Sequence, residues 1–269
     1  MRIKFLGTGA SEGIPSMFCD CEVCRTARKL KGKEIRARMG MLIDDDLMID
    51  FSPDLFLNSV RYEIDFSNLK GILLTHSHKD HLDIENIKPR ILLENEETVP
   101  SWSVFGGRSV VKYLEGSGAT ANLTLHELVY SEPFIIGEYR VVAFHSTHLV
   151  NEDSMVFLIQ KNGKSYLHLC DTGELAEDVY EYLKENKVVI DAVAFDCTYG
   201  ILKEKYFGHL NLGQIVEICD RFKKLKIFTR STGIYLTHIC HWGGTHEQLE
   251  KEAAGYGIKV AYDGLELEI

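Results

Sequence analysis

The chain has 269 residues, of which 45% are hydrophobic and 26% are charged, an ordinary composition for a soluble globular protein. Lysine and arginine number 30 against 40 aspartates and glutamates, and the formal net charge of −10 disfavours long DNA or RNA as a partner. A small phosphorylated substrate is compatible with this charge, because bound metal ions can supply local positive charge. No apolar run reaches the roughly 18 residues of a membrane-spanning helix, so we expect no membrane partner.

Residues 1–7 predict a short strand that enters a glycine turn. They lack the long apolar region and the small-residue cleavage site of a secretory signal, so we expect a cytoplasmic protein. Three of the seven cysteines crowd into the segment that follows, at Cys19, Cys21 and Cys24. In a reducing cytoplasm, such crowding favours metal binding over disulfide bonds.

Short apolar segments predict strands through the middle of the chain. Residues 41–43 and 47–51 flank three consecutive aspartates and predict a hairpin, and residues 71–75 form an apolar run that ends at a histidine cluster. Three further strands are predicted at residues 140–144, 155–160 and 165–170. A weak helical pattern follows between residues 171 and 183.

The C-terminal third alternates strands with helices. Asn211 with Gln214, and Thr245 with Gln248, resemble capping boxes that begin helices, the second of them near residues 246–255. Strands are predicted at residues 188–195, 225–229, 234–237, 258–262 and 265–269. This alternation, without any linker composition, predicts one layered α/β domain with mixed sheets over residues 1–269.

The segment from His76 to His81 carries four metal-competent side chains directly after a predicted strand. Residues two apart point the same way where a strand ends, so His76 and His78 can bind one ion together. Asp80 and His81 turn with the loop and can face a second ion. Imidazole and carboxylate ligands suit zinc, manganese or iron, and three protein ligands leave one position open for water. The pattern therefore favours a metal centre over a solvated polar loop.

This segment resembles the His-x-His-x-Asp-His motif of the metallo-β-lactamase superfamily, whose fold is a four-layer αβ/βα sandwich. The resemblance implies a hydrolase with two divalent ions in its active site. It assigns His76, His78 and His148 to one ion, Asp80, His81 and His238 to the other, and Asp171 as the bridge between them. Asp50 matches an aspartate that contacts ligands rather than ions. His145 competes with His148, but the distance to the next predicted strand favours His148.

The cysteine cluster offers three thiolates and needs a fourth ligand to close a tetrahedral zinc site. Together with the glycine-rich stretch before it, the cluster resembles a cyclic phosphodiesterase subgroup related to the bacterial phosphonate (carbon–phosphorus lyase) pathway. That resemblance implies a structural zinc held by Cys19, Cys21, Cys24 and His241. Cys240 and His246 remain rival candidates for the fourth ligand. A site with four protein ligands has no open position, so we expect a structural role.

Two ions at close range can share a hydroxide, lower the pKa of that water toward neutrality, and polarise a phosphoryl or carbonyl oxygen. Asp80 belongs to this catalytic centre as a ligand. His209 aligns with the catalytic histidine of the subgroup, and we expect it to donate a proton to the departing alkoxide. The leading hypothesis is a phosphodiesterase for a small phosphorylated metabolite, cyclic ones included.

Three alternatives stay open at this point. A tRNA 3′-processing endonuclease shares the ligands, although no Lys/Arg-rich insertion for tRNA is present. A thioester or lactone hydrolase would use the same metal pair. A zinc-stabilised binding module without activity would be expected to have lost a ligand, and none is missing. The ligand set tolerates zinc, manganese or iron, and the sequence leaves a homodimer open.

Overall fold

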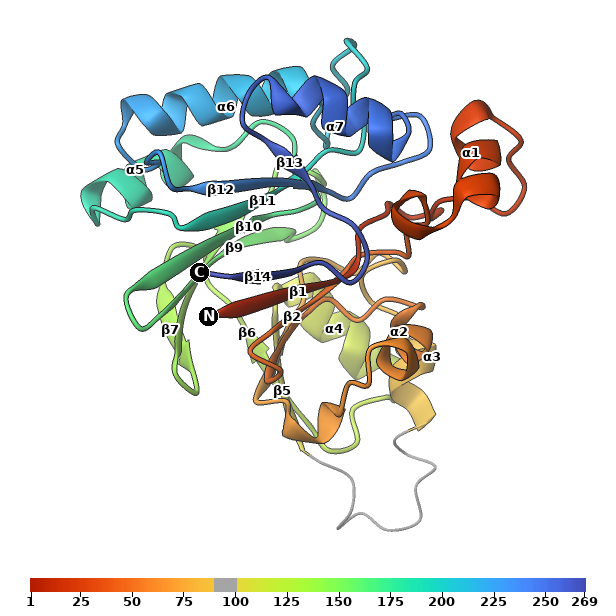
Figure 1. The fold of residues 1–269 in the computed structure, drawn as a ribbon. Helices are drawn as coiled ribbons and strands as arrows, with labels where there is room; N and C mark the ends of the chain where they lie inside the picture. Colours follow the sequence, from red (N-terminus) through yellow and green to blue (C-terminus); the bar gives the residue numbers. More distant parts are fainter. Residues whose placement is uncertain (90–100) are drawn as a thin grey trace.

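The computed structural model describes residues 1–89 and 101–269 of the chain (Figure 1). The described strands form two seven-stranded sheets that lie face to face. One sheet has the order β14-β1-β2-β3-β4-β5-β6, and the other has the order β13-β12-β11-β10-β9-β8-β7. Each sheet combines antiparallel and parallel pairs, so the predicted mixed sheets are confirmed.

The first sheet is built mainly from the N-terminal half of the chain. Its strands are β1 (Arg2–Gly7), β2 (Gly40–Ile43), β3 (Leu47–Ile49), β4 (Gly71–Leu73), β5 (Trp102–Gly106), β6 (Leu123–Glu127) and β14 (Glu266–Glu268). The predicted hairpin is confirmed, because β2 and β3 pair antiparallel with Met41 opposite Ile49. β3, β4, β5 and β6 then run parallel, so their carboxyl ends share one edge of the sheet.

The second sheet contains the strands β7 (Pro133–Ile136), β8 (Tyr139–His145), β9 (Met155–Lys161), β10 (Lys164–Leu169), β11 (Ala192–Asp196), β12 (Gly233–Thr237) and β13 (Lys259–Val260). β10, β11, β12 and β13 are parallel neighbours. β8 and β10 both pair antiparallel with β9, so they too run in the same direction. The carboxyl ends of β8, β10, β11 and β12 therefore meet at one edge.

Helices cover the outer faces of the two sheets and complete a four-layer αβ/βα sandwich, which confirms the predicted fold (Figure 1). The described helices are α1 (Glu22–Leu30), which stands apart at the side of the sandwich in Figure 1, α2 (Leu55–Arg61), α3 (Ile84–Ile87), α4 (Arg108–Ser117), α5 (Glu177–Glu185), α6 (Leu212–Lys224) and α7 (His246–Ala254). None of the helices in the described residues has the length and apolar character needed to cross a membrane.

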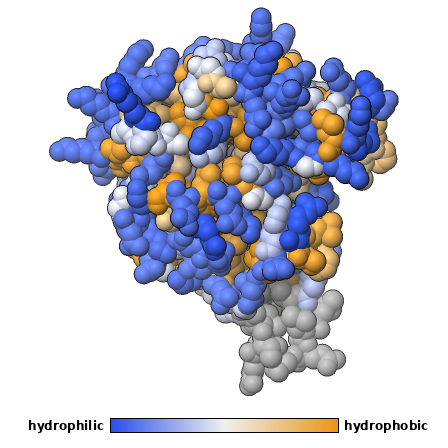
Figure 2. Space-filling model, viewed as in Figure 1, coloured by the Kyte–Doolittle hydropathy of each residue, from blue (hydrophilic) through white to orange (hydrophobic). Residues whose placement is uncertain are grey.

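The hydrophobic core follows the layers. One cluster, which includes Phe5 and Phe157, fills the space between the sheets. A second cluster packs α5, α6 and α7 against the second sheet, and a third packs α2 and α4 against the first. The face seen in Figure 2 is largely hydrophilic, with hydrophobic residues between the charged ones.

Two predicted helix starts are confirmed by their caps. The Asn211 side chain accepts a hydrogen bond from the Gln214 backbone N–H at 2.9 Å, and the Gln214 side chain accepts one from the Asn211 N–H at 3.2 Å. Thr245 and Gln248 form the same reciprocal pair before α7. Both caps satisfy backbone donors that a helix start leaves free.

The strand predicted at residues 225–229 is wrong. β11 pairs directly with β12, so the sheet has no place for another strand between them. Residues 225–229 instead form the turn that ends α6. Their apolar character has a different cause, because Ile227 and Phe228 are buried in the core beneath α6. The strand predicted at 188–195 is also shorter than expected, since β11 begins only at Ala192.

We predict that Phe157→Ala lowers the free energy of unfolding by about 3–5 kcal/mol, because it removes a fully buried ring from the space between the sheets. Phe56→Ala, at a site 66% exposed on α2, should change the free energy of unfolding by no more than about 0.5 kcal/mol. Urea unfolding of the metal-free proteins measures both values. Equal losses in the two variants would contradict the described core.

Candidate metal centre

The predicted ligands lie where strands of both sheets end. His76 follows β4, His148 follows β8, Asp171 follows β10, and His238 follows β12. The carboxyl ends of parallel strands meet at one edge, which is a common place for ligand sites in α/β proteins. Residues more than 150 positions apart in the sequence thus contact one another: the Nε2 atoms of His81 and His238 are 3.3 Å apart.

Three imidazoles form the first group. The ligand atoms of His76, His78 and His148 lie within 4.8 Å of one another. His148 Nδ1 donates a hydrogen bond to the Gly208 carbonyl at 3.1 Å, which leaves the Nε2 lone pair free for an ion. His145 is not part of this group, because its half-buried ring packs against Tyr130 with the centroids 5.4 Å apart.

The second group contains two carboxylates and two imidazoles. Ligand atoms of Asp80, His81, Asp171 and His238 also lie within 4.8 Å of one another. His81 Nε2 is 2.6 Å from Asp171 Oδ2 and 3.2 Å from Asp80 Oδ2. Asp171 Oδ2 is in addition 3.3 Å from His76 Nε2, so this carboxylate touches both groups. The structure therefore brings together all seven residues that the resemblance assigns to the two ions.

Asp50 contacts Thr75 and the predicted ligand His81, and it orients the His81 ring. Its carboxylate accepts hydrogen bonds from the Thr75 N–H and hydroxyl at 2.9 Å, and His81 Nδ1 lies 2.7 Å from its other oxygen. With its Nδ1–H donated to Asp50, the neutral ring of His81 would present its Nε2 lone pair to an ion. Asp50, Asp171 and His238 all adopt positive φ values, of 61°, 48° and 53°. Such strain in non-glycine residues is typical of functional sites.

The buried polar atoms of the two groups fit a metal ion. His76 Nε2 and Asp171 Oδ1 are buried and have no hydrogen-bond partner, although unpaired buried polar atoms cost free energy. Burial raises the pKa of the Asp171 carboxyl, but His238 and His81 outweigh burial and hold that pKa well below its usual range. Asp171 is therefore ionised at neutral pH. A divalent cation would satisfy the carboxylate and both orphaned atoms, and the N/O donors suit zinc, manganese or iron.

The carboxylates around His81 favour a positive charge on its imidazole ring. Burial lowers this pKa, but the carboxylates of Asp171, Asp50 and Asp80 outweigh burial and raise it well above the usual value. A proton on His81 thus takes the place of a cation among these carboxylates. Metal binding would release it, because only the neutral imidazole is a ligand.

His209 lies beside the second group, in the loop before α6. Its Nδ1 is 2.8 Å from Asp196 Oδ2, 3.1 Å from the Thr198 hydroxyl and 3.4 Å from Asp171 Oδ1. Burial lowers the pKa of His209, but the charge and hydrogen bond of Asp196 outweigh burial and raise it to about 9. His209 is therefore an imidazolium near neutral pH, ready to donate a proton.

Sequence reasoning missed Asp196 and Thr198. Asp196 is fully buried at the end of β11 and also accepts hydrogen bonds from the backbone N–H groups of Thr198 and Leu210. The Thr198 hydroxyl contacts Nδ1 of both His209 and His238, at 3.1 Å and 2.9 Å. The available signal was a carboxylate at the end of a predicted buried strand, the same placement as Asp50 and Asp171.

The cysteine cluster forms a separate group with His241. The sulfur atoms of Cys19, Cys21 and Cys24 and a ring nitrogen of His241 lie within 4.8 Å of one another. His241 Nδ1 is 3.2 Å from Cys19 Sγ and 3.4 Å from Cys21 Sγ. The rival His246 lies elsewhere, with its Nδ1 2.9 Å from the buried Arg36 guanidinium.

Cys21 has the thiolate character of a metal ligand. Burial raises the pKa of its thiol, but hydrogen bonds from the Cys24 N–H and with His241 and Cys19 outweigh burial and lower it to about 6. The rival Cys240 differs, because it is not among the four side chains whose ligand atoms lie together in this group. Four soft and borderline ligands in one cluster fit zinc.

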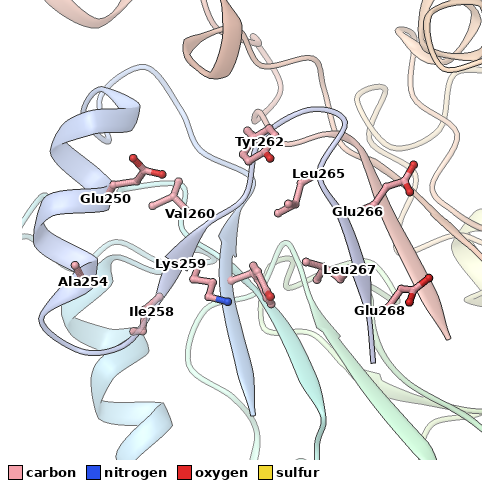
Figure 3. Close-up of a pocket in the computed structure, with 11 residues that line it drawn as sticks. Glu250, Ala254, Ile258, Lys259, Val260, Tyr262, Leu265, Glu266, Leu267 and Glu268 are labelled. Carbon is pink, nitrogen blue, oxygen red and sulfur yellow. The ribbon is translucent and has the colours of Figure 1, made fainter. Parts of the chain in front are cut away.

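The histidine–aspartate groups and the cysteine group border a cleft of about 430 Å³. Its lining includes members of the two histidine–aspartate groups, His209, and three consecutive residues beside the cysteine cluster, Cys240, His241 and Trp242. A second cavity, of about 620 Å³, lies at the seam between β13, β14 and α7 (Figure 3). The described residues that line it include no histidine or cysteine, and its carboxylates and Lys259 surround apolar side chains. The candidate catalytic and metal-binding side chains therefore lie at the smaller cleft.

Comparison with known proteins agrees with the fold. A family model described as the beta-lactamase superfamily domain matches residues 46–239. A diphosphatase of the PhnP family is similar in structure, with a TM-score of 0.79 and 23% identity over 100% of this chain and 98% of that one. Zinc-bound PqqB from Methylobacterium extorquens has a TM-score of 0.78 at 16% identity, with both chains covered completely. Human tRNase Z, short form, has a TM-score of 0.67 at 18% identity over 100% and 99% of the two chains. At such identities, the likeness shows the fold alone.

Two curated proteins match shorter segments. An octanoyltransferase of Porphyromonas gingivalis is 38% identical over 86 residues, which are 30% of this chain and 16% of that protein. Coenzyme PQQ synthesis protein B of Bradyrhizobium diazoefficiens is 37% identical over 59 residues, 20% of this chain and 19% of that protein. The match thus covers less than a fifth of either relative's length.

We predict that Cys21→Ser and His241→Ala each lose one bound zinc per chain and keep the ions of the histidine–aspartate groups, since the two sites share no side chain. Cys240→Ser is the matched control and should keep its zinc. Mass spectrometry of metal content after zinc loading and dialysis measures the difference. Loss of zinc from Cys240→Ser, with retention in His241→Ala, would reverse the assignment of the fourth ligand.

Proposed function

The chain belongs to the beta-lactamase superfamily and has its metallo-β-lactamase fold, and from this premise we propose that it is a dinuclear metal-dependent phosphodiesterase acting on a small phosphorylated metabolite. The observation that carries the proposal is the position of His209, a partly buried histidine whose Nδ1 lies 2.8 Å from Asp196 Oδ2 beside the ligand groups. Hydrolysis of an alkyl phosphodiester needs such an acid, because an alkoxide is a poor leaving group.

Two sets of side chains would hold the ions. His76, His78 and His148 would hold one, and Asp80, His81 and His238 the other, with Asp171 between them. Two divalent ions held by these residues would supply an activated water and would polarise a phosphoryl oxygen. The cysteine group with His241 would hold a structural zinc. We propose a cytoplasmic setting, where these thiols stay reduced.

His209 and its partners would manage the proton. His209 Nδ1–H donates to Asp196, so Nε2 carries the proton that can reach a leaving group. Asp196 keeps the ring in this tautomer and supports its positive charge. The Thr198 hydroxyl contacts both His209 and His238, so it links the acid to the ligand group.

The charge of the cleft favours a diester over a monoester. Among the described residues that line it there is no lysine or arginine, and Glu12 adds a carboxylate. A phosphodiester carries one negative charge, whereas a phosphomonoester carries about 1.5 to 2 at neutral pH. A cleft without lysine or arginine side chains suits the less charged substrate.

We predict turnover of bis(p-nitrophenyl) phosphate by zinc- or manganese-loaded protein, well above that of p-nitrophenyl phosphate. Release of p-nitrophenolate measures both rates. The metal-free protein is the control and should be inactive, since the activated water requires the ions. No turnover of the diester with either metal at full occupancy would contradict the proposed function.

The acid is tested by the leaving group. His209→Ala should lose about 100-fold or more in kcat on glycerol 1,2-cyclic phosphate, whose alkoxide needs a proton, and much less on bis(p-nitrophenyl) phosphate. His145→Ala, which changes a histidine outside the cleft, should keep both activities. Equal losses of His209→Ala on the two substrates would contradict a role as the general acid.

Asp196→Asn tests the same proton through the pH profile. Asp196 raises the pKa of His209, so removing its charge lowers that pKa. Because the acid must be protonated, the alkaline limb of kcat on glycerol 1,2-cyclic phosphate should move to lower pH in the variant. An unchanged alkaline limb would show that His209 does not set it.

A further inference from the structure

One wall of the cleft carries a large exposed ring. Trp242 lines the cleft and is 64% exposed, and the half-buried Tyr199 lines it too. Aromatic side chains left exposed in a concave site are characteristic of ligand contact, because stacking buries their apolar faces. The proposed mechanism makes no use of either ring.

The backbone holds Trp242 in a fixed place. It lies in a turn that the Gly243 N–H closes by donating to the Cys240 carbonyl at 3.0 Å. The Ile201 N–H donates to the Gly243 carbonyl at 3.0 Å, and a Cβ added to Gly200 would lie only 1.9 Å from the same oxygen. The segments that carry Tyr199 and Trp242 are therefore packed directly against each other. Both rings are presented to the cleft by a rigid support.

The cysteine group fixes Trp242 from the other side. Trp242 directly follows His241, whose Nδ1 lies 3.2 Å from Cys19 Sγ. The two rings are also in contact, with centroids 5.4 Å apart and an angle of 42° between their planes. A zinc ion in the cysteine group would thus hold Trp242 at the cleft as well as fasten the N-terminal loop.

The polar groups near Trp242 do not attract further negative charge. Glu12 accepts a hydrogen bond from the His241 N–H at 3.2 Å and lines the same cleft, together with the small hydroxyl residues Ser11 and Ser16. In the described part of the cleft, no lysine or arginine is present to receive a second phosphate. The part of a substrate that reaches this wall is therefore uncharged and finds rings and hydroxyl groups.

We propose that Trp242, with Tyr199 beside it, is the stacking platform for an uncharged planar ring, and that the substrates are small phosphodiesters bearing a nucleobase-like ring. This inference rests on the proposed function and narrows its substrate class. A cleft of about 430 Å³ accommodates a mononucleotide rather than a folded nucleic acid. Stacking of a base on an aromatic side chain changes affinity by about tenfold or more.

The test compares two cyclic diesters with the same five-membered phosphate ring. Adenosine 2′,3′-cyclic phosphate carries a base, and glycerol 1,2-cyclic phosphate does not. Trp242→Ala should lose about tenfold in kcat/KM on the adenosine substrate, through KM, and keep its rate on the glycerol substrate. Trp242→Phe should retain most of the preference. Phe56→Ala, which removes an equally exposed ring on α2, is the matched control.

Fluorescence gives a readout that does not depend on turnover. The chain has two tryptophans, and Trp102 is only 6% exposed, so Trp242 is the one accessible to a ligand. In metal-loaded His209→Ala protein, which turns over slowly, adenosine 2′,3′-cyclic phosphate should quench the tryptophan emission. The double variant with Trp242→Phe should show no quenching, because only Trp102 remains.

The outcomes separate this inference from the proposed function. Equal hydrolysis of the adenosine and glycerol substrates would contradict the stacking platform. An equal loss of activity on both substrates in Trp242→Ala would also contradict it. Neither result would contradict the proposed phosphodiesterase function. Absence of quenching in the presence of bound metal would overturn the platform as well. Failure of the metal-loaded protein to hydrolyse any diester would contradict the proposed function, and the inferred substrate class would then be wrong as well.

Discussion

The carboxylate of Asp171 is only 2% exposed, and its Oδ2 lies 2.6 Å from His81 Nε2 and 3.3 Å from His76 Nε2. A buried carboxylate without compensation is costly, so a positive charge must accompany it in every state of the site. In the protein alone, protons on the neighbouring imidazoles meet this requirement, which is why the pKa of His81 is raised. With metal ions bound, the ions would replace the protons. The rest of the site serves this exchange: Asp50 orients His81, and Asp196 supports the charge of His209.

The fold brings several buried carboxylates to one site by placing each of them at the end of a different strand. Asp50, Asp171 and Asp196 each lie at the end of a buried strand, and two of them adopt positive φ. Because these carboxylates lie on separate strands, each has its own hydrogen-bond donors. The sheets supply those donors from neighbouring backbone, such as the Thr75 N–H for Asp50 and the Leu210 N–H for Asp196. The stability of the two packed sheets offsets the backbone strain and the charge repulsion at this edge.

Patterns within a few residues of one another could be predicted from the sequence. The segment His76–His81 and the cap formed by Asn211 and Gln214 are local, because their chemistry depends on spacing along the chain. The partner of His209 could not be predicted, since Asp196 reaches it only through the path of the loop between them. Nor could spacing alone choose His241 over Cys240 or His246, because all three lie in one short stretch and only packing decides which faces the cysteines. The apolar run at residues 225–229 was misread as a strand because a buried turn has the same composition.

The central claim is that two ions bind around Asp171, and anomalous X-ray diffraction from manganese-loaded crystals tests it most directly. The account predicts two anomalous peaks at the cleft, one among His76, His78 and His148 and the other among Asp80, His81 and His238, with the Asp171 carboxylate between them. A single peak at full manganese occupancy, or peaks that do not contact Asp171, would contradict the account.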